Sequence, residues 1–176
     1  MRLDLLLVLT TVIFFTSCTF SVPQADSLFA VSVKKSVGSE EGFDDTFMWT
    51  ARLGREGRLV RLYEGGPHGF IFVAEEGDII SFDGWVIRSV KGFGLEGALS
   101  VEGNSKERTY ASPGRSETRD FCSDWTRSYI EEVAHWHQQC SGFPTHNVIV
   151  VDAAGNVVSI KQAIEASGKQ LILDKL

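Results

Sequence analysis

Short apolar runs, broken by glycine and acidic residues, follow one another along the chain from Leu28 to Tyr110. β-branched and aromatic residues dominate these runs, which is typical of strands. Several runs alternate, so that Leu59 and Tyr63 would lie on the opposite face of a strand from Val60. We therefore predict strands at residues 28–33, 46–53, 58–64, 69–74, 78–82, 85–90 and 97–102.

The breaks between the runs have the composition of turns. Glu64-Gly65-Gly66 and Glu76-Gly77-Asp78 each place glycine beside an acidic residue. Asp83-Gly84 predicts a hairpin with a type I′ turn, in which both central residues need positive φ. Strands at a spacing of roughly ten residues, without helical patterns between them, indicate an antiparallel arrangement. The sequence therefore predicts an all-β fold, an antiparallel meander or barrel-like single domain.

The remainder of the chain is less uniform. The segment from Asn104 to Asp120 is the most polar, and we predict that it carries a long exposed loop around Pro113-Gly114. Three apolar segments near the end predict strands at 147–152, 157–164 and 170–176, with a turn at 153–156.

Residues 124–140 fit two periodicities. One set of residues has helical spacing, and another set would share one face of a strand. The helical set is Tyr129, Val133, Trp136 and Cys140, and the strand set is Ala134, Trp136, Gln138 and Cys140. The pattern alone slightly favours a helix.

An apolar run near the first residue predicts a processed leader. Leu5 to Phe15 spans 11 residues, too few to cross a bilayer but enough for a signal peptide. Phe15-Thr16-Ser17-Cys18 resembles the bacterial lipobox, in which the cysteine becomes the new, lipid-bearing N-terminus. We predict a lipoprotein signal peptide at 1–17, a lipidated tether at 18–27 and a periplasmic all-β domain at 28–176. The alternative is a plain signal peptide with a chance cysteine.

The residue after the cysteine and the cysteine count refine this prediction. Thr19, in place of aspartate, favours sorting to the outer membrane of a Gram-negative cell. Of the three cysteines, assigning Cys18 to the lipid leaves Cys122 and Cys140 as a pair. In an oxidising periplasm this pair would form a disulfide, although two separate buried thiols are the alternative.

Charge excludes one class of partner. The chain carries a formal net charge of −6 and is therefore a poor candidate for binding nucleic acid, whose phosphates require a basic face.

The histidines of "HWHQQC" are the strongest metal candidates. His135 and His137 would lie on one face of a strand, and Cys122, Cys140 and His146 could complete four zinc ligands. A Cys140 disulfide would remove the thiolate, however, and no second close pair of ligands is present. We therefore predict surface histidines, no metal and no other cofactor.

Other apparent motifs predict no chemistry. "GFGLEG", residues 92–97, matches a nucleotide-binding glycine pattern, but the segment after it reads as a strand and not as the required helix. The acidic pairs would face opposite sides of a strand, so none builds a glycosidase site alone, and we predict solvated turns. These pairs are Asp44-Asp45, Glu75-Glu76 and Glu131-Glu132. The chain has no Gly-x-Ser-x-Gly elbow.

The last thirty residues, "NVIVVDAAGNVVSIKQAIEASGKQLILDKL", resemble the ending of the YjbF/GfcB-type lipoproteins of group 4 capsule and exopolysaccharide formation. Asn147, Gly155, Ser159 and Gln162 stand at the corresponding places, with Ser159 and Gln162 one residue further apart. "DIISFDGWVIRSVKGFG" is similar to a strand-turn-strand of the same family. "HWHQQC" stands where that family has a strand with a lone cysteine, which favours strand over helix for 129–140.

The resemblance implies an outer-membrane-anchored periplasmic lipoprotein that assists capsule or exopolysaccharide assembly or export without catalysis. Its partners would be the membrane, through the lipid, and a polysaccharide or proteins of the export machinery. Two alternatives remain: a metal- or ligand-binding lipoprotein that uses His135 and His137, and a carbohydrate-active enzyme.

Aromatic side chains are the candidate saccharide contacts, because sugars stack apolar faces on aromatic rings. Trp85 is the first choice, since it follows the Asp83-Gly84 turn and would lie near a rim of the sheet. The alternative is that most of these residues are core. The full set is Trp49, Trp85, Trp125 and Trp136, with Tyr63 and Tyr110 behind them.

We expect Cys18 to be lipid-modified in the native protein, because the apolar run closes on a lipobox-like sequence. Intact-mass measurement of protein from bacterial membranes should show loss of residues 1–17 and a gain of acyl groups. Cys18→Ser should release the protein or block its processing. An unmodified Cys18 in native material would contradict the lipoprotein prediction.

Overall fold

The structure, a computed structural model, describes residues 47–64, 69–165 and 168–176. In these residues thirteen strands form one sheet. The strands are β1 (Met48–Leu53), β2 (Glu56–Glu64), β3 (Phe70–Ala74), β4 (Ile79–Phe82), β5 (Ile87–Lys91), β6 (Leu99–Gly103), β7 (Glu107–Ala111), β8 (Thr118–Phe121), β9 (Thr126–Ile130), β10 (Val133–Gln138), β11 (Asn147–Val151), β12 (Val157–Ala163) and β13 (Gln170–Lys175).

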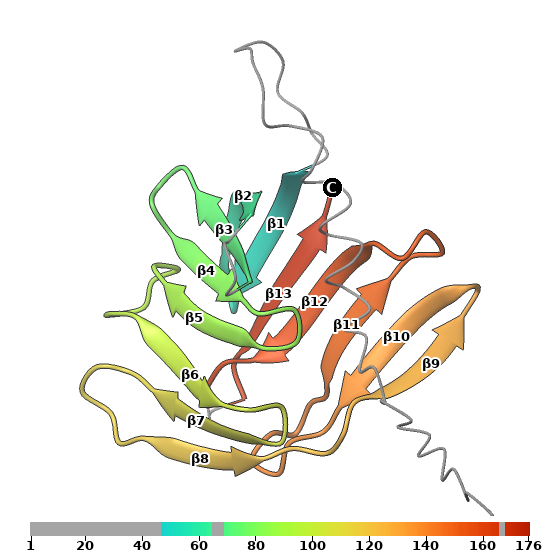
Figure 1. The fold of residues 1–176 in the computed structure, drawn as a ribbon. Coiled ribbons are helices and arrows are strands. Elements are labelled where there is room, and N and C mark those ends of the chain that lie inside the picture. Colours follow the sequence, from blue (N-terminus) through green and yellow to red (C-terminus); the bar gives the residue numbers. More distant parts are fainter. Residues whose placement is uncertain (1–46, 65–68, 166–167) are drawn as a thin grey trace, which may run out of the picture.

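Each strand pairs antiparallel with its neighbours, in the order β8-β7-β6-β5-β4-β3-β2-β1-β13-β12-β11-β10-β9. The chain therefore runs as two meanders that meet where β1 pairs with β13. The sheet curls into a half-barrel, with β3–β5 across from β12 and β13 (Figure 1). The predicted all-β antiparallel meander is confirmed.

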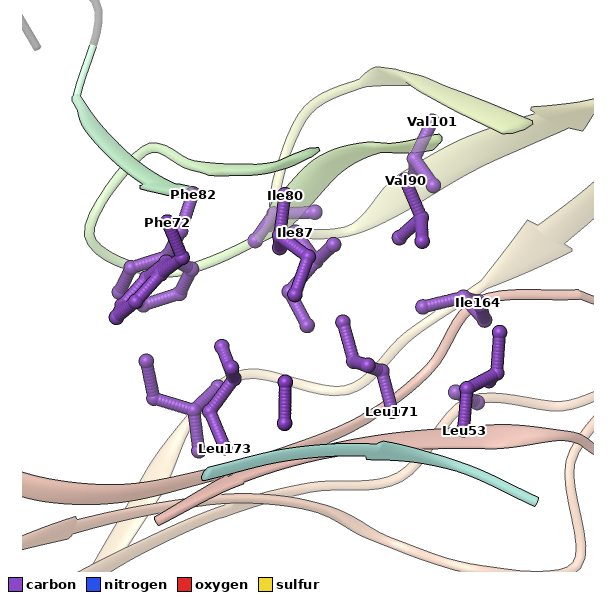
Figure 2. Packing of buried hydrophobic residues seen from close by; sticks show 14 of the residues in the cluster. Leu53, Phe72, Ile80, Phe82, Ile87, Val90, Val101, Ile164, Leu171 and Leu173 are labelled. Atoms are coloured by element: carbon purple, nitrogen blue, oxygen red, sulfur yellow. The ribbon is translucent and has the colours of Figure 1, made fainter. Parts of the chain in front are cut away.

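Alternating apolar residues from both walls of the half-barrel fill its interior. Phe72, Phe82 and Ile80 descend from one wall toward Leu171 and Leu173 on the other (Figure 2). All five side chains are buried, and each contributes about 1.5–3 kcal/mol through removal from water. The same alternation places Leu59 and Tyr63 of β2 on the face opposite the buried Val60, as predicted from the sequence, and both are exposed.

The strands predicted from apolar runs at 46–53, 58–64, 69–74, 78–82, 85–90, 97–102, 147–152, 157–164 and 170–176 are present, with ends displaced by one or two residues. The predicted strand at 28–33, the turn at Gly65-Gly66, the acidic pair Asp44-Asp45 and the lipidation site Cys18 lie outside the described residues. Within those residues, no helix has the length and apolar character needed to cross a membrane.

The β4–β5 hairpin is confirmed, but its predicted type I′ turn is wrong. Gly84 has positive φ whereas Asp83 does not, and four residues separate the strands. The Asp83 carboxylate accepts hydrogen bonds from the amides of Trp85 and Val86, at 2.8 and 2.6 Å, and binds the Arg88 guanidinium. A side chain therefore holds this wider turn, and Trp85 lies in the turn and not in a strand.

The exposed loop predicted around Pro113-Gly114 is present but shorter than expected, because the polar segment 104–120 also contains β7 and β8. Only residues 112–117, around Pro113-Gly114, connect the two strands. Arg108, Tyr110 and Asp120 point to the interior and are buried. Polar residues thus occupy the inward positions that apolar residues occupy in the other strands, and the usual strand pattern is absent.

Residues 124–140 form an antiparallel hairpin, β9 and β10, and the helix favoured by the periodicity alone is wrong. The strand assignment for 129–140, based on the family resemblance, is confirmed, except that two strands meet there. The turn between them is Glu131-Glu132, and both residues have positive φ, at 48° and 69°. These two residues are exposed in a turn, as predicted for this acidic pair.

Gln162 of β12 joins the two walls across the interior. Its Oε1 accepts a hydrogen bond from the Ile87 amide at 3.0 Å, and its Nε2 donates one to the Trp85 carbonyl at 2.6 Å. Gln162 is fully buried, so water does not compete for these two hydrogen bonds from the side of Gln162. The side chain therefore positions the β4–β5 turn, including Trp85, over the far half of the sheet.

We expect Gln162→Ala to lower the free energy of unfolding by about 2 kcal/mol, because it removes two hydrogen bonds between the walls and takes away the acceptor of the buried Ile87 amide. Gln170→Ala is the matched control, since the Gln170 amide bonds Thr145 and the His146 carbonyl at the surface. Its effect should stay below about 1 kcal/mol. Urea unfolding of both variants tests this, and equal losses would contradict the assigned role of Gln162.

Candidate functional site

Three of the four tryptophans gather at the end of the sheet formed by β9 and β10. The Trp85 ring lies 5.3 Å from the Trp125 ring and 5.2 Å from the Trp136 ring, between centroids. All three side chains are half-buried and pack against the edge of the apolar core. We call Trp85, Trp125 and Trp136 the tryptophan cluster.

The fold brings the cluster together from distant parts of the chain. Trp136 pairs with Ile149 in the β10–β11 ladder and shares its inward face. Trp125 immediately precedes β9, and Trp85 arrives from the opposite wall on the turn that Gln162 holds.

Arg127 and Tyr129 continue this surface along β9. The Arg127 guanidinium lies 5.2 Å from the Tyr129 ring centroid and 5.3 Å from that of Trp136. Tyr129 is 62% exposed, because β9 is an edge strand of the sheet. No carboxylate of the described residues forms an ion pair with Arg127, whose charge the rings hold in place instead.

The tryptophan cluster, Arg127 and Tyr129 together place aromatic rings beside a guanidinium whose orientation is fixed by ring contacts. Aromatic faces stack on the apolar faces of sugar rings, and a guanidinium binds a carboxylate through paired hydrogen bonds. The surface therefore has the chemistry needed to hold an acidic saccharide. We call Trp85, Trp125, Arg127, Tyr129 and Trp136 the aromatic edge.

The other aromatic candidates lie elsewhere. Trp49 is a core residue, with 2% of its side chain exposed and its ring 5.3 Å from that of Phe72. Tyr110 is buried against Phe143, and Tyr63 is exposed on the outer face of β2. Arg127 and Tyr129 were not predicted as contacts from the sequence, although their i, i+2 spacing beside Trp125 was available as a signal.

The two predicted disulfide partners are joined in the structure. Cys122, just after β8, bonds Cys140, just after β10, with an S–S distance of 2.05 Å. Main-chain hydrogen bonds flank the disulfide, from the Ser123 amide to the Gln139 carbonyl and from the Ser141 amide to the Phe121 carbonyl. β8 and β9 are the opposite edges of the sheet, so these contacts tie one edge to the hairpin that forms the other.

Gln138 reinforces this connection from the buried side. Its amide donates to the carbonyls of Ser105 and Ser123, at 2.6 and 2.9 Å, and its oxygen accepts from the Arg108 guanidinium. Asn147, a position shared with the resembled family, donates to the same oxygen and to Cys140 Sγ, both at 3.4 Å. We call the disulfide and the contacts of Gln138 the edge clasp.

The histidines lie on the other face of β10 from Trp136. His135 and His137 stack with centroids 6.1 Å apart, and His146, from the β10–β11 connection, lies 6.4 Å from His137. Burial lowers the pKa of the His137 imidazole below its ordinary value, and the His135 and His146 rings lower it further. Cys122 and Cys140 do not join them as ligands, because both sulfurs are in the disulfide.

The remaining motifs behave as turns within the described residues. "GFGLEG" connects β5 to β6, with a hydrogen bond from the Leu95 amide to the Gly92 carbonyl, and a strand follows it. Glu75-Glu76 is an exposed turn between β3 and β4. A shallow pocket near Gly97 and Pro113 contains Glu165, whose carboxylate pairs with Arg115 at 2.7 Å.

Comparison with known proteins identifies a shared fold. The chain matches no protein-family profile and no curated protein. It is similar to the crystal structure of the hypothetical lipoprotein YmcC from Escherichia coli, with a TM-score of 0.51 and 12% sequence identity. The match covers 72% of this chain and 81% of that one. The similarity shows the same fold in a bacterial lipoprotein and assigns no role.

We expect the Cys122–Cys140 disulfide in the native protein, and non-reducing peptide mapping should recover the linked peptides. Reduction should lower the free energy of unfolding by about 3 kcal/mol, since the bond closes a loop of 18 residues. Cys18→Ser is the control and should leave the linkage intact. Free thiols at both positions would contradict the pairing.

Proposed function

We propose that this protein is a non-catalytic lipoprotein, anchored at the periplasmic face of the outer membrane, that binds an acidic polysaccharide during capsule or exopolysaccharide assembly or export. The observation that carries the proposal is the position of Arg127 between the rings of Trp136 and Tyr129. This is an exposed cation without an ion-pair partner among the described residues, placed beside stacking surfaces.

The physical chemistry of the aromatic edge supports an acidic sugar over a neutral one. The chain carries a net charge of −6, so long-range attraction does not favour a polyanion. Binding must therefore come from short-range contacts, and a preoriented guanidinium supplies them at low entropic cost. A surface at the edge of the sheet, unlike a closed pocket, can accept an internal segment of a long polymer.

The lipobox-like sequence at Cys18 and the fold shared with a bacterial lipoprotein support the membrane anchor. The sequence resemblance to the YjbF/GfcB type supports the link to surface polysaccharide. The absence of catalysis is part of the proposal: among the described residues, Glu75-Glu76 and Glu131-Glu132 lie in exposed turns, and Glu165 is held by Arg115.

We expect Arg127→Ala to weaken binding of the acidic surface polysaccharide of the host cell by about 10-fold or more, because a hydrogen bond to a charged group contributes about 1.5–3 kcal/mol. Tyr129→Ala should weaken it to a smaller extent. Calorimetry with the native polymer and with its carboxyl-reduced form measures the effect. The reduced form should bind the wild-type protein and Arg127→Ala equally weakly.

Arg119→Ala is a matched control on the opposite edge of the sheet. Arg119 also lies over an aromatic ring two residues away, that of Phe121 at 5.6 Å, but it pairs with Glu107. This variant should retain full binding. Equal binding by Arg127→Ala and the wild type, with both folded, would reject the aromatic edge as the site.

The cellular role has its own test. Deleting the gene should reduce surface polysaccharide while growth continues, and wild-type protein should restore the polymer where Arg127→Ala does not. Full polysaccharide in the deletion strain would reject the assigned function. Restoration by Arg127→Ala would reject only the binding surface. Trp85→Ala is a poorer probe, since its ring packs between two others and its loss would disturb the cluster.

A further inference from the structure

Three of the four histidines of the chain converge on the outer face of β10. His135 and His137 are held at i, i+2 on a strand that is paired on both sides, so their Cα atoms cannot separate. His146 reaches the same place from the β10–β11 connection. All three side chains retain access to solvent. Their convergence does not depend on the aromatic edge, whose one member on β10, Trp136, lies on the inward face of that strand.

The spacing of the rings is slightly wider than that of imidazoles on a shared metal ion. Imidazoles that bind one zinc ion at about 2.0–2.1 Å place their ring centres roughly 5–6 Å apart. The observed centroid distances are 6.1 Å for His135–His137 and 6.4 Å for His137–His146. The nitrogens of the three rings do not all lie within 4.8 Å of one another. A shared ion therefore requires these solvent-accessible side chains to rotate about χ1 and χ2.

A hydroxyl is already placed to orient the central ring. Ser128 Oγ of β9 lies 3.2 Å from His137 Nε2. Histidine ligands of metals characteristically use one ring nitrogen for the metal and the other for such a partner, which fixes the tautomer and the ring plane. With Nε2 bonded to Ser128, Nδ1 is the free nitrogen of His137.

A competing cluster of donors can be set aside. Asp120, Cys122 and Cys140 bring donor atoms within 4.8 Å of one another, but the sulfurs are bonded to each other and cannot act as thiolates. Among the described residues, the three histidines are a second gathering of metal-ligating side chains, defined by the spacing of their rings and not by nitrogens within 4.8 Å of one another.

We infer that His135, His137 and His146 form a surface site for a borderline transition-metal ion, Zn²⁺ or Cu²⁺, in which water completes the coordination and Ser128 positions His137. Imidazole donors without carboxylates select such ions and discriminate against Mg²⁺ and Ca²⁺, which prefer oxygen ligands. The site goes beyond the proposed polysaccharide function and does not require it.

Calorimetric titration of the full chain, with its disulfide intact, tests the site with Zn²⁺ and with Mg²⁺. We expect one Zn²⁺ per chain and no binding of Mg²⁺. The double variant His135→Asn/His137→Asn should lose Zn²⁺ binding, and His146→Asn should weaken it. His68→Asn is the control for loss of a histidine elsewhere in the sequence and should bind as the wild type does.

Ser128→Ala separates positioning from ligation. It should lower the Zn²⁺ affinity by about 10-fold, the usual effect of removing an outer partner of a histidine ligand, while the stoichiometry stays at one. NMR should show Zn²⁺ shifting the ring signals of His135, His137 and His146 and not those of His68. Absence of binding at millimolar Zn²⁺, or undiminished binding by the folded double variant, would overturn the inference.

Discussion

The short connection between β8 and β9 is the constraint on which the rest of the structure depends. These strands are consecutive in the chain but form opposite edges of a thirteen-stranded sheet. Only Cys122 to Trp125 lie between them. The five peptide steps from Phe121 to Thr126 can span at most about 18 Å. The sheet must therefore curl until its two edges meet at this corner, and the half-barrel follows from that requirement.

The edge clasp fixes the corner with buried polar groups as well as a covalent bond. Gln138 satisfies both its amide protons and its oxygen there, with Ser105, Ser123 and Arg108 as partners. Burial lowers the pKa of the Arg108 guanidinium from its ordinary value, and nearby Tyr110 opposes that shift. Burying such groups costs free energy that their mutual hydrogen bonds largely offset. The network instead specifies the register of the strands, because a strand shifted along its neighbour would leave these polar groups without hydrogen-bond partners.

The strands whose inward residues are apolar could be predicted from the sequence, because burial and alternation coincide in them. β7 and β8 could not, since Arg108 and Asp120 occupy their inward positions and have hydrogen-bond partners far along the chain, Gln138 for Arg108 and Ser141 and Gly142 for Asp120. The β9–β10 turn gave no signal either, because two glutamates adopt positive φ there in place of glycine.

The candidate site was predictable only where local sequence information suffices to place a residue. Trp85 was singled out by its place beside a turn, which needs only local information. Arg127 and Tyr129 are exposed because no opposite wall covers β9, and which strand becomes an edge is decided by the whole sheet. Asn147 and Gln162, which stand at places shared with the resembled family, are buried and accept hydrogen bonds from main-chain amides of other strands. A resemblance based on them therefore speaks for the fold more than for the chemistry.

The position of the aromatic edge depends on buried contacts of the edge clasp and of Gln162. An uncovered edge strand invites pairing with other chains, and the exposed charges of Arg127, Glu131 and Glu132 make that pairing unfavourable. The same exposure leaves β9 supported by β10 alone, so the β9–β10 hairpin would be the first part of the sheet to open locally. The edge clasp holds the base of this hairpin, while Gln162 holds the turn that carries Trp85 against it. The surface proposed to bind saccharide thus depends for its shape on contacts that never touch the ligand.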